Sequence, residues 1–170
     1  MLLCNDSELY MRFDKIGEYI DGLIDDYNKD GEIYSNILYI PISENEEENI
    51  SALNPYGSNL SKLSTEFQMG ETMLVIADSK SDELVQPEDT LVDLEEIYPD
   101  NPYVKGYGFY INRTDFAEII GYEENLPDDI YIGVRKVTKT LSPDEKTREN
   151  YEYAMKTLDK IIENLSKLDS

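Results

Sequence analysis

Residues 130–168 read IYIGVRKVTKTLSPDEKTRENYEYAMKTLDKIIENLSKL, and this stretch contains both kinds of element on which the fold depends. Within residues 130–138, the apolar side chains of Ile130, Ile132 and Val134 alternate with the side chains of the intervening residues. A period of two is typical of a strand whose two faces have different surroundings. The first part of the stretch therefore predicts a strand.

The second part of the stretch predicts a helix of about six turns. Ser142 and Glu145 have the spacing of a capping box, and Pro143 stands at the first helical position. Apolar residues then recur at spacings of three and four, which places them on one side of a helix. These residues are Tyr151, Ala154, Leu158, Ile161, Leu165 and Leu168.

A second amphipathic helix is predicted near the start of the chain, over residues 7–28. Asp6 or Ser7 can cap it, and Gly31 follows as a helix stop. Its apolar stripe consists of Leu9, Phe13, Ile16, Ile20, Leu23 and Tyr27. The two helices either pair with each other or each pack one stripe on a sheet. We favour packing on a sheet, because sustained coiled coils need more heptads.

Further strands are predicted between these helices, over residues 32–42, 72–78 and 103–111. Residues 43–70 are expected to contain a solvated acidic start, a turn at residues 54–57 and one short helix. Thr114 is expected to cap another short helix over residues 115–121. The predicted fold class is α+β, with an N-terminal helix, a mostly antiparallel sheet of four to five strands, short intervening helices and a long C-terminal helix packed on the sheet.

Charge is unevenly distributed along the chain, which is expected to form one domain over residues 1–170. The 37 acidic and 15 basic residues give a net charge of −22. Residues 1–134 form an acidic body of net charge −23, whereas residues 135–170, the last strand end and the C-terminal helix, carry a net charge of +1. Such a body repels nucleic acid and anionic membranes, and it attracts basic protein surfaces.

The start of the chain and its single cysteine predict the cellular location. Only three apolar residues open the chain before Cys4, which is too short a run for a signal peptide. Cys4 cannot form an internal disulfide, which fits a reducing compartment. No stretch approaches the ~20 apolar residues that span a bilayer. We therefore expect a soluble cytoplasmic protein.

The chain contains no histidine, which excludes Ser–His and Cys–His catalysis and histidine-based metal sites. Residues 26–33 match an EF-hand calcium loop at positions 1, 3, 5, 6 and 8, but Ile37 stands at position 12, where calcium requires a glutamate. Residues 106–108, with two glycines around Tyr107, favour a bulge or a close backbone approach over a phosphate loop. We predict no catalytic residue, no metal site and no cofactor.

A candidate interaction surface lies in residues 82–102, which hold eight acidic residues and no lysine or arginine. Pro87, Pro99 and Pro102 interrupt this segment, so it is expected to be exposed and locally stiff. Carboxylates beside tyrosines combine steering charge with aromatic anchors, as interaction surfaces do. The alternative is a surface that only confers solubility. The predicted partner-binding residues are Glu88, Asp89, Asp93, Glu95, Glu96, Tyr98, Asp100, Tyr103, Tyr122, Glu123 and Glu124.

These features predict a non-enzymatic acidic inhibitor that binds a basic protein surface and does not itself bind nucleic acid or membranes. One form is a nucleic-acid mimic in the basic channel of a nucleic-acid-processing defence enzyme, as in anti-CRISPR or anti-restriction proteins of phages and mobile elements. The alternative is an immunity protein or antitoxin that neutralises a basic toxin. A third hypothesis is a small carboxylate-dependent enzyme. A dimer through the C-terminal helix is left open.

Overall fold

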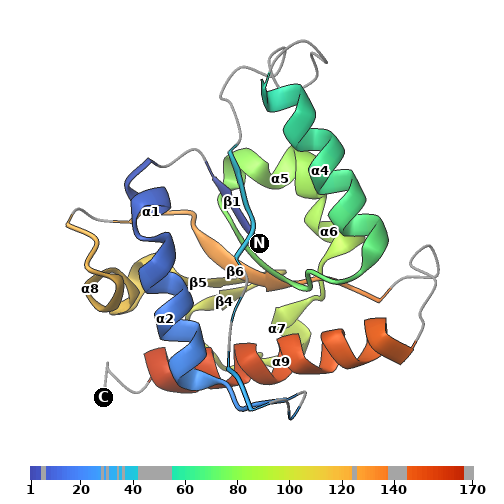
Figure 1. Cartoon of the computed structure of the whole chain (residues 1–170). Helices are drawn as coiled ribbons and strands as arrows, with labels where there is room; N and C mark the ends of the chain where they lie inside the picture. The colour runs from blue at the N-terminus through green and yellow to red at the C-terminus, as the bar shows by residue number, and fades with distance from the viewer. Residues whose placement is uncertain are drawn as a thin grey trace.

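Six short strands form one mixed sheet, and helices cover both of its faces (Figure 1). The computed structural model describes residues 1–4, 7–27, 29, 31–33, 35, 37–41, 55–123, 126–137 and 145–166. The order of the strands across the sheet is β2-β1-β3-β6-β5-β4. The strands are β1 (Leu2–Cys4), β2 (Tyr39–Pro41), β3 (Leu74–Ala77), β4 (Val104–Lys105), β5 (Gly108–Tyr110) and β6 (Tyr131–Val134).

One half of the sheet is parallel and the other half is antiparallel. β1 pairs in parallel with β2 and with β3, whereas β3, β6, β5 and β4 pair antiparallel in that order. Leu2 and Leu3 of β1 are fully buried, because this strand lies between two others. The predicted α+β class is confirmed. The sheet has six strands instead of four to five, and β1 is a strand that the sequence analysis did not predict.

The helices are α1 (Ser7–Met11), α2 (Phe13–Leu23), α4 (Pro55–Met69), α5 (Asp82–Val85), α6 (Pro87–Thr90), α7 (Leu94–Ile97), α8 (Phe116–Ile120) and α9 (Glu145–Ser166). They divide between the two faces of the sheet (Figure 1). Helices α2, α7, α8 and α9 enclose one hydrophobic cluster with Phe109 and Ile132. Helices α4 and α5 enclose a second cluster with Leu3, Val75 and Tyr131. The predicted alternation of residues 130–134 is therefore confirmed, with both faces of β6 buried.

The predicted N-terminal helix is broken at Arg12 and ends earlier than expected. Arg12 has φ −95° and ψ 9°, so α1 and α2 are separate helices. The predicted stripe is nevertheless used, because Leu9, Ile16 and Ile20 are buried. The chain becomes extended at Ile24, and the left-handed residue Gly31 (φ +89°) lies well beyond the helix end instead of stopping it.

All four predicted strands are shorter or divided in the structure, and β3 and β6 keep four residues each of the predicted ranges 72–78 and 130–138. Of the described residues between 32 and 42, only Tyr39–Pro41 form a strand, and Ile33 is 47% exposed. Residues 103–111 form the β4–β5 hairpin and not a single strand, with Gly106 at φ +53° in the turn. A Cβ atom on Gly108 would lie 2.8 Å from Cγ of Tyr131, so the predicted close backbone approach is confirmed.

The segment before β3 is more helical than predicted. Pro55 begins α4, where its missing N–H costs nothing, so residues 55–57 start a helix and do not form a turn. The predicted acidic start of this segment and Asn54 lie outside the described residues. The short helix predicted over residues 115–121 is confirmed as α8, and Thr114 Oγ1 accepts a hydrogen bond from the Phe116 N–H at 3.3 Å.

The long C-terminal helix is confirmed as α9. Leu158, Ile161 and Leu165 are fully buried, and α9 contacts both β6 and α2. The Tyr19 hydroxyl of α2 donates to Oδ1 of Asn164 at 3.0 Å. The two amphipathic helices therefore pack on the sheet and also on each other. Ser142 of the predicted capping box, Pro143 and Leu168 lie outside the described residues, and Glu145 is the first residue of α9.

Among the described residues, no helix has the length and the hydropathy that a bilayer crossing requires.

Candidate functional site

The acidic segment, residues 82–102, contains three one-turn helices, α5, α6 and α7. Val85, Leu91 and Leu94 are fully buried and fix this segment to the core. Pro87 stands at the start of α6, where its ring fits the first turn of a helix. The acidic side chains fall in the first turns of α5, α6 and α7, where carboxylates interact favourably with the helix dipole. Of these three helices, α7 has a side-chain cap, from Asp93, whereas α5 and α6 have none, and the stiffness of the segment stays a prediction.

The acidic segment bends around the tip of the β4–β5 hairpin. The pKa of Tyr107 is raised by desolvation and then by the negative charges of four carboxylates. We call these four carboxylates, together with Tyr107, the acidic face: Glu88, Asp89, Asp93, Glu96 and Tyr107. The structure thus brings four of the predicted residues together around a tyrosine that the sequence analysis did not include.

The carboxylates of the acidic face have no cationic partner in the described part of the chain. None of the ion pairs among the described residues involves a side chain between residues 82 and 100. Lys136 lies nearby, 5.4 Å from the ring centroid of Tyr107, but its Nζ donates to the main-chain oxygen of Glu88 at 2.6 Å. Glu88, Asp89 and Glu96 are exposed, so their charges face solvent.

Some predicted residues hold the acidic face in place. Asp93 Oδ1 accepts from the main-chain N–H groups of Glu95 and Glu96 at 3.1 and 3.4 Å, which caps α7. Glu95 Oε2 accepts from the N–H of Gly106 at 2.8 Å and so ties α7 to the hairpin turn. Tyr98 donates its hydroxyl to Asp159 of α9. These side chains have structural partners as well as charge or aromatic character.

A surface hollow of about 650 Å³ lies at the end of α7. It is lined by Ser166 of α9 and by residues 97–103, which include the predicted residues Tyr98, Asp100 and Tyr103. Ile97 at its border is 46% exposed. The Tyr103 ring packs edge-on against Phe109, with ring centroids 6.3 Å apart, so it lines the hollow as a fixed group.

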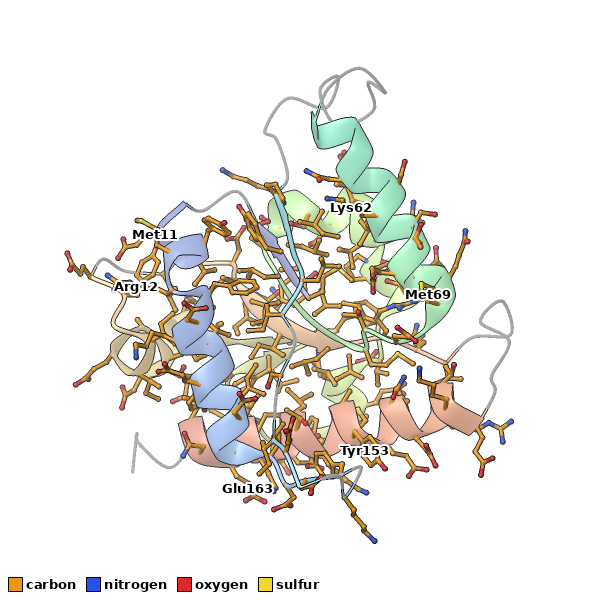
Figure 2. All side chains as sticks on the ribbon, in the orientation of Figure 1. Met11, Arg12, Lys62, Met69, Tyr153 and Glu163 are labelled. Carbon is orange, nitrogen blue, oxygen red and sulfur yellow. The ribbon has the colours of Figure 1, made fainter. Side chains whose placement is uncertain are left out.

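The structure places the remaining predicted residues elsewhere. Tyr122 and Glu123 follow α8 at the opposite end of the sheet strands, where Glu123 Oε1 is 3.7 Å from the guanidinium of Arg12. Figure 2 shows Arg12 beside Met11, at the turn from α1 to α2. Glu124 lies outside the described residues. The candidate residues therefore form two separate groups, and only the group around Tyr107 forms one acidic face.

A second acidic group, which the sequence analysis did not single out, lies where β3 ends. Burial raises the pKa of Asp82, and the charges of Asp78 and Asp129 raise it further, against a hydrogen bond from Tyr131. Each carboxylate has a partner inside the group: Tyr131 donates to Asp82 at 2.7 Å, Ser81 Oγ lies 2.7 Å from Asp78, and Ser79 bonds Asp129. Asp78 directly follows a buried strand, which is the signal that could have found it. This internal bonding is typical of a structural role.

In the calcium-like loop, the first would-be ligand, Asp26, bonds the main chain. The N–H of Gly31 donates to Oδ2 of Asp26 at 2.9 Å, which satisfies one oxygen of the first would-be ligand. Asn28 and Asp30 lie outside the described residues. Within the part of the chain that the structure describes, no group of three or more Asp, Glu, Cys or His side chains is arranged to hold a metal ion.

Fold and site together define an α+β protein with a mixed six-stranded sheet and one exposed acidic face. No protein-family model matches the sequence, and no curated protein or solved structure matches it significantly.

Proposed function

We propose that this protein is a non-enzymatic, acidic inhibitor that uses the acidic face to bind a basic surface of a partner protein. The observation that supports this proposal is the group of exposed carboxylates Glu88, Asp89 and Glu96, which form no ion pair with the described residues and whose charges raise the pKa of Tyr107, on a chain of net charge −22. Unpaired carboxylates on a rigid frame lose little conformational entropy when a basic partner binds them.

The arrangement supports recognition in two steps. The net negative charge attracts a basic partner over several ångströms and raises the rate of encounter. Tyr107 and the hollow beside Ile97 then offer apolar contact area next to the charge. Charges alone give salt-sensitive encounters, whereas buried aromatic and aliphatic contacts slow dissociation.

The partner that fits this chemistry best is the basic channel of a nucleic-acid-processing enzyme, in the cytoplasm. Carboxylates on short helices can take the place of phosphates for lysine and arginine side chains. A basic toxin remains the alternative partner, in which case the protein is an immunity protein or antitoxin. The apolar stripe of α9 is buried within the chain, so a dimer through this helix would use its polar side.

The experiment compares three versions of the protein as bait in lysate of the native host. The first is the wild type. The second is Glu88→Gln, Asp89→Asn and Glu96→Gln together, which removes three exposed charges and leaves the Asp93 cap and the Glu95 bond intact. The matched control neutralises three exposed acids elsewhere, Glu118, Glu149 and Glu152, and has the same net charge.

We expect the wild type and the control to capture the same basic protein, and the acidic-face variant to lose it. A nucleic-acid-processing enzyme as the captured protein supports the first partner class, and a toxin supports the second. If the acidic-face variant captures as much of the partner as the control does, the acidic face is not the binding surface and the proposal fails.

A further inference from the structure

A pocket of about 480 Å³ lies on the other side of the molecule's core from the acidic group at the end of β3. Its walls come from α2 and the residues after α2, from the start of β3, and from the middle of α9. Figure 2 shows Tyr153, one of its lining residues, on α9. Its volume is within the range of pockets that hold small organic molecules.

The pocket combines an apolar floor with aromatic and acidic groups. Ile20 and Ile24 line it from α2 and the residues beyond, and Ala154 lines it from α9. Tyr27 stacks on Tyr153, with ring centroids 4.7 Å apart and planes inclined by 13°, so the two rings form one rigid part of the wall. Such a lining suits a ligand with an apolar or aromatic body of modest size.

The charged side chains of the lining are both acidic. Glu71 already pairs with Lys146, whose Nζ is 2.7 Å away. Glu66 is half-buried and accepts a hydrogen bond from Thr72 Oγ1 at 2.7 Å, and no ion pair among the described residues involves it. Among the described residues that line the pocket there is no lysine or arginine, and the nearest lysine to the tyrosine pair, Lys156, has its Nζ 5.9 Å from the Tyr27 ring centroid and 5.6 Å from that of Tyr153. Glu66 is therefore the carboxylate with capacity for a further cation.

Arg135 and the Met1 amino group interact electrostatically with Glu66, but neither forms an ion pair with its carboxylate among the described residues. Arg135 donates to the main-chain oxygens of Glu66, Phe67 and Thr72, not to the carboxylate. The amino group of Met1 donates to the Leu74 oxygen at 2.6 Å, and its burial lowers its pKa to about 5, which leaves it largely uncharged at neutral pH.

We propose that this pocket binds a small organic amine, with the ammonium group on Glu66 and the apolar body against the Tyr27–Tyr153 pair and the floor of α2 and α9. A half-buried carboxylate without a cation gains most from a ligand that supplies one. The negative field of the whole chain favours cations further. An amine of this kind can be a free molecule or the lysine side chain of a protein. The proposal does not depend on the function of the acidic face.

The test is a titration of the full-length protein with small probes, with binding measured from two-dimensional NMR spectra. The buffer contains about 150 mM salt, which weakens non-specific electrostatic attraction. The probes are 2-phenylethylamine, its neutral counterpart 2-phenylethanol and the anionic 3-phenylpropanoate. We expect saturable binding of the amine with a Kd of about 1 mM, as its size allows. Shifts should be confined to pocket residues such as Ala154 and Thr157, and binding of the alcohol and the acid should be at least tenfold weaker.

Two variants test whether Glu66 binds the amine, and a further probe tests whether the amine is a free molecule or a protein lysine. Glu66→Gln keeps an acceptor for Thr72 and should weaken amine binding at least fivefold, whereas Glu118→Gln, on the exposed side of α8, should leave it unchanged. N-acetyl-lysine methylamide identifies the source: binding equal to that of phenylethylamine favours a protein lysine, and weaker binding favours a free amine. The proposal is overturned if no probe saturates, if the alcohol binds as well as the amine, or if Glu66→Gln binds the amine as the wild type does.

Discussion

Arg135 fixes the end of α4 to the end of β6. Its guanidinium donates to three main-chain oxygens at the end of α4 and before β3, and it lies 4.1 Å above the ring of Phe67. Burial lowers its pKa to about 10, so it stays charged at neutral pH in spite of being only 3% exposed. The carbonyls at a helix C-terminus have no partner within the helix, so a buried cation is a favourable cap there.

Arg135→Lys should destabilise the protein, because an ammonium group cannot reproduce the planar fork that reaches these oxygens. We expect the free energy of unfolding in urea to fall by about 2 kcal/mol. Arg148→Lys, on the exposed side of α9, is the control and should change it by less than about 0.5 kcal/mol. Equal stability of the two variants would mean that the bonds of Arg135 do not stabilise the fold.

Asp82 should make stability depend on pH in a defined direction. Burial raises its pKa in the folded protein above the usual value of 3.8, so ionisation of Asp82 costs more in the folded state than in the unfolded chain. This cost is absent below the unfolded pKa and grows as the pH rises through the folded pKa. Asp82→Asn keeps an oxygen for the Tyr131 hydroxyl and removes the cost.

The measurement for Asp82 is the free energy of unfolding of Asp82→Asn relative to wild type, between about pH 4 and pH 7. As the pH rises, the free energy of unfolding of Asp82→Asn should increase relative to that of the wild type. A difference for Asp82→Asn that is constant with pH, or that favours the wild type more at pH 7, would contradict the raised pKa.

At the scale of elements, length decides what the sequence can predict. The C-terminal helix repeats its period often enough to be recognised, and α9 confirms it, whereas the strand predicted over residues 130–138 is confirmed only for Tyr131–Val134, which form β6. β1 and β4 have three and two residues, too few to show any period. The sequence around the hairpin turn at Gly106 is rich in tyrosine and resembles a single strand, so the turn could not be predicted.

The candidate site shows the same division between local and long-range information. The acids of α6 and α7 are neighbours in sequence, so composition alone indicated them. Tyr107 joins them only because the β4–β5 turn folds back over α7, which no local pattern predicts. Tyr122 and Glu123 also combine a tyrosine with an acidic residue, as the acidic segment does. They follow α8, however, and therefore lie at the other end of the strands.

Helix α9 should be essential to the fold. Its fully buried residues complete the cluster on one face of the sheet, so deletion of residues 143–170 would expose a large apolar patch. We expect the truncated chain to be insoluble or to lose its near-ultraviolet circular dichroism. As a milder test, Leu158→Ala should cost about 2–5 kcal/mol, and the exposed control Glu152→Ala should cost little. A truncated chain that is monomeric and melts at the wild-type temperature would show that α9 is dispensable.

At the scale of the whole molecule, like charges repel one another across the surface. With a net charge of −22, the folded state should be stabilised by salt, which screens this repulsion. We expect the melting temperature to rise between about 10 mM and about 500 mM sodium chloride. The triple variant at Glu88, Asp89 and Glu96 should have a higher melting temperature at low salt, and its melting temperature should rise less with salt. A melting temperature that falls with salt would show that attractive ion pairs dominate instead.

The most direct test of the acidic face is the rate at which the captured partner associates with it. Association should be measured at about 50 mM and about 500 mM salt for the wild type, the acidic-face variant and the matched-charge control. We predict that the wild-type and control rates fall at least tenfold with salt, and that the variant associates slowly at both concentrations. A variant that retains the wild-type rate and its salt dependence would contradict the assignment of partner binding to the acidic face.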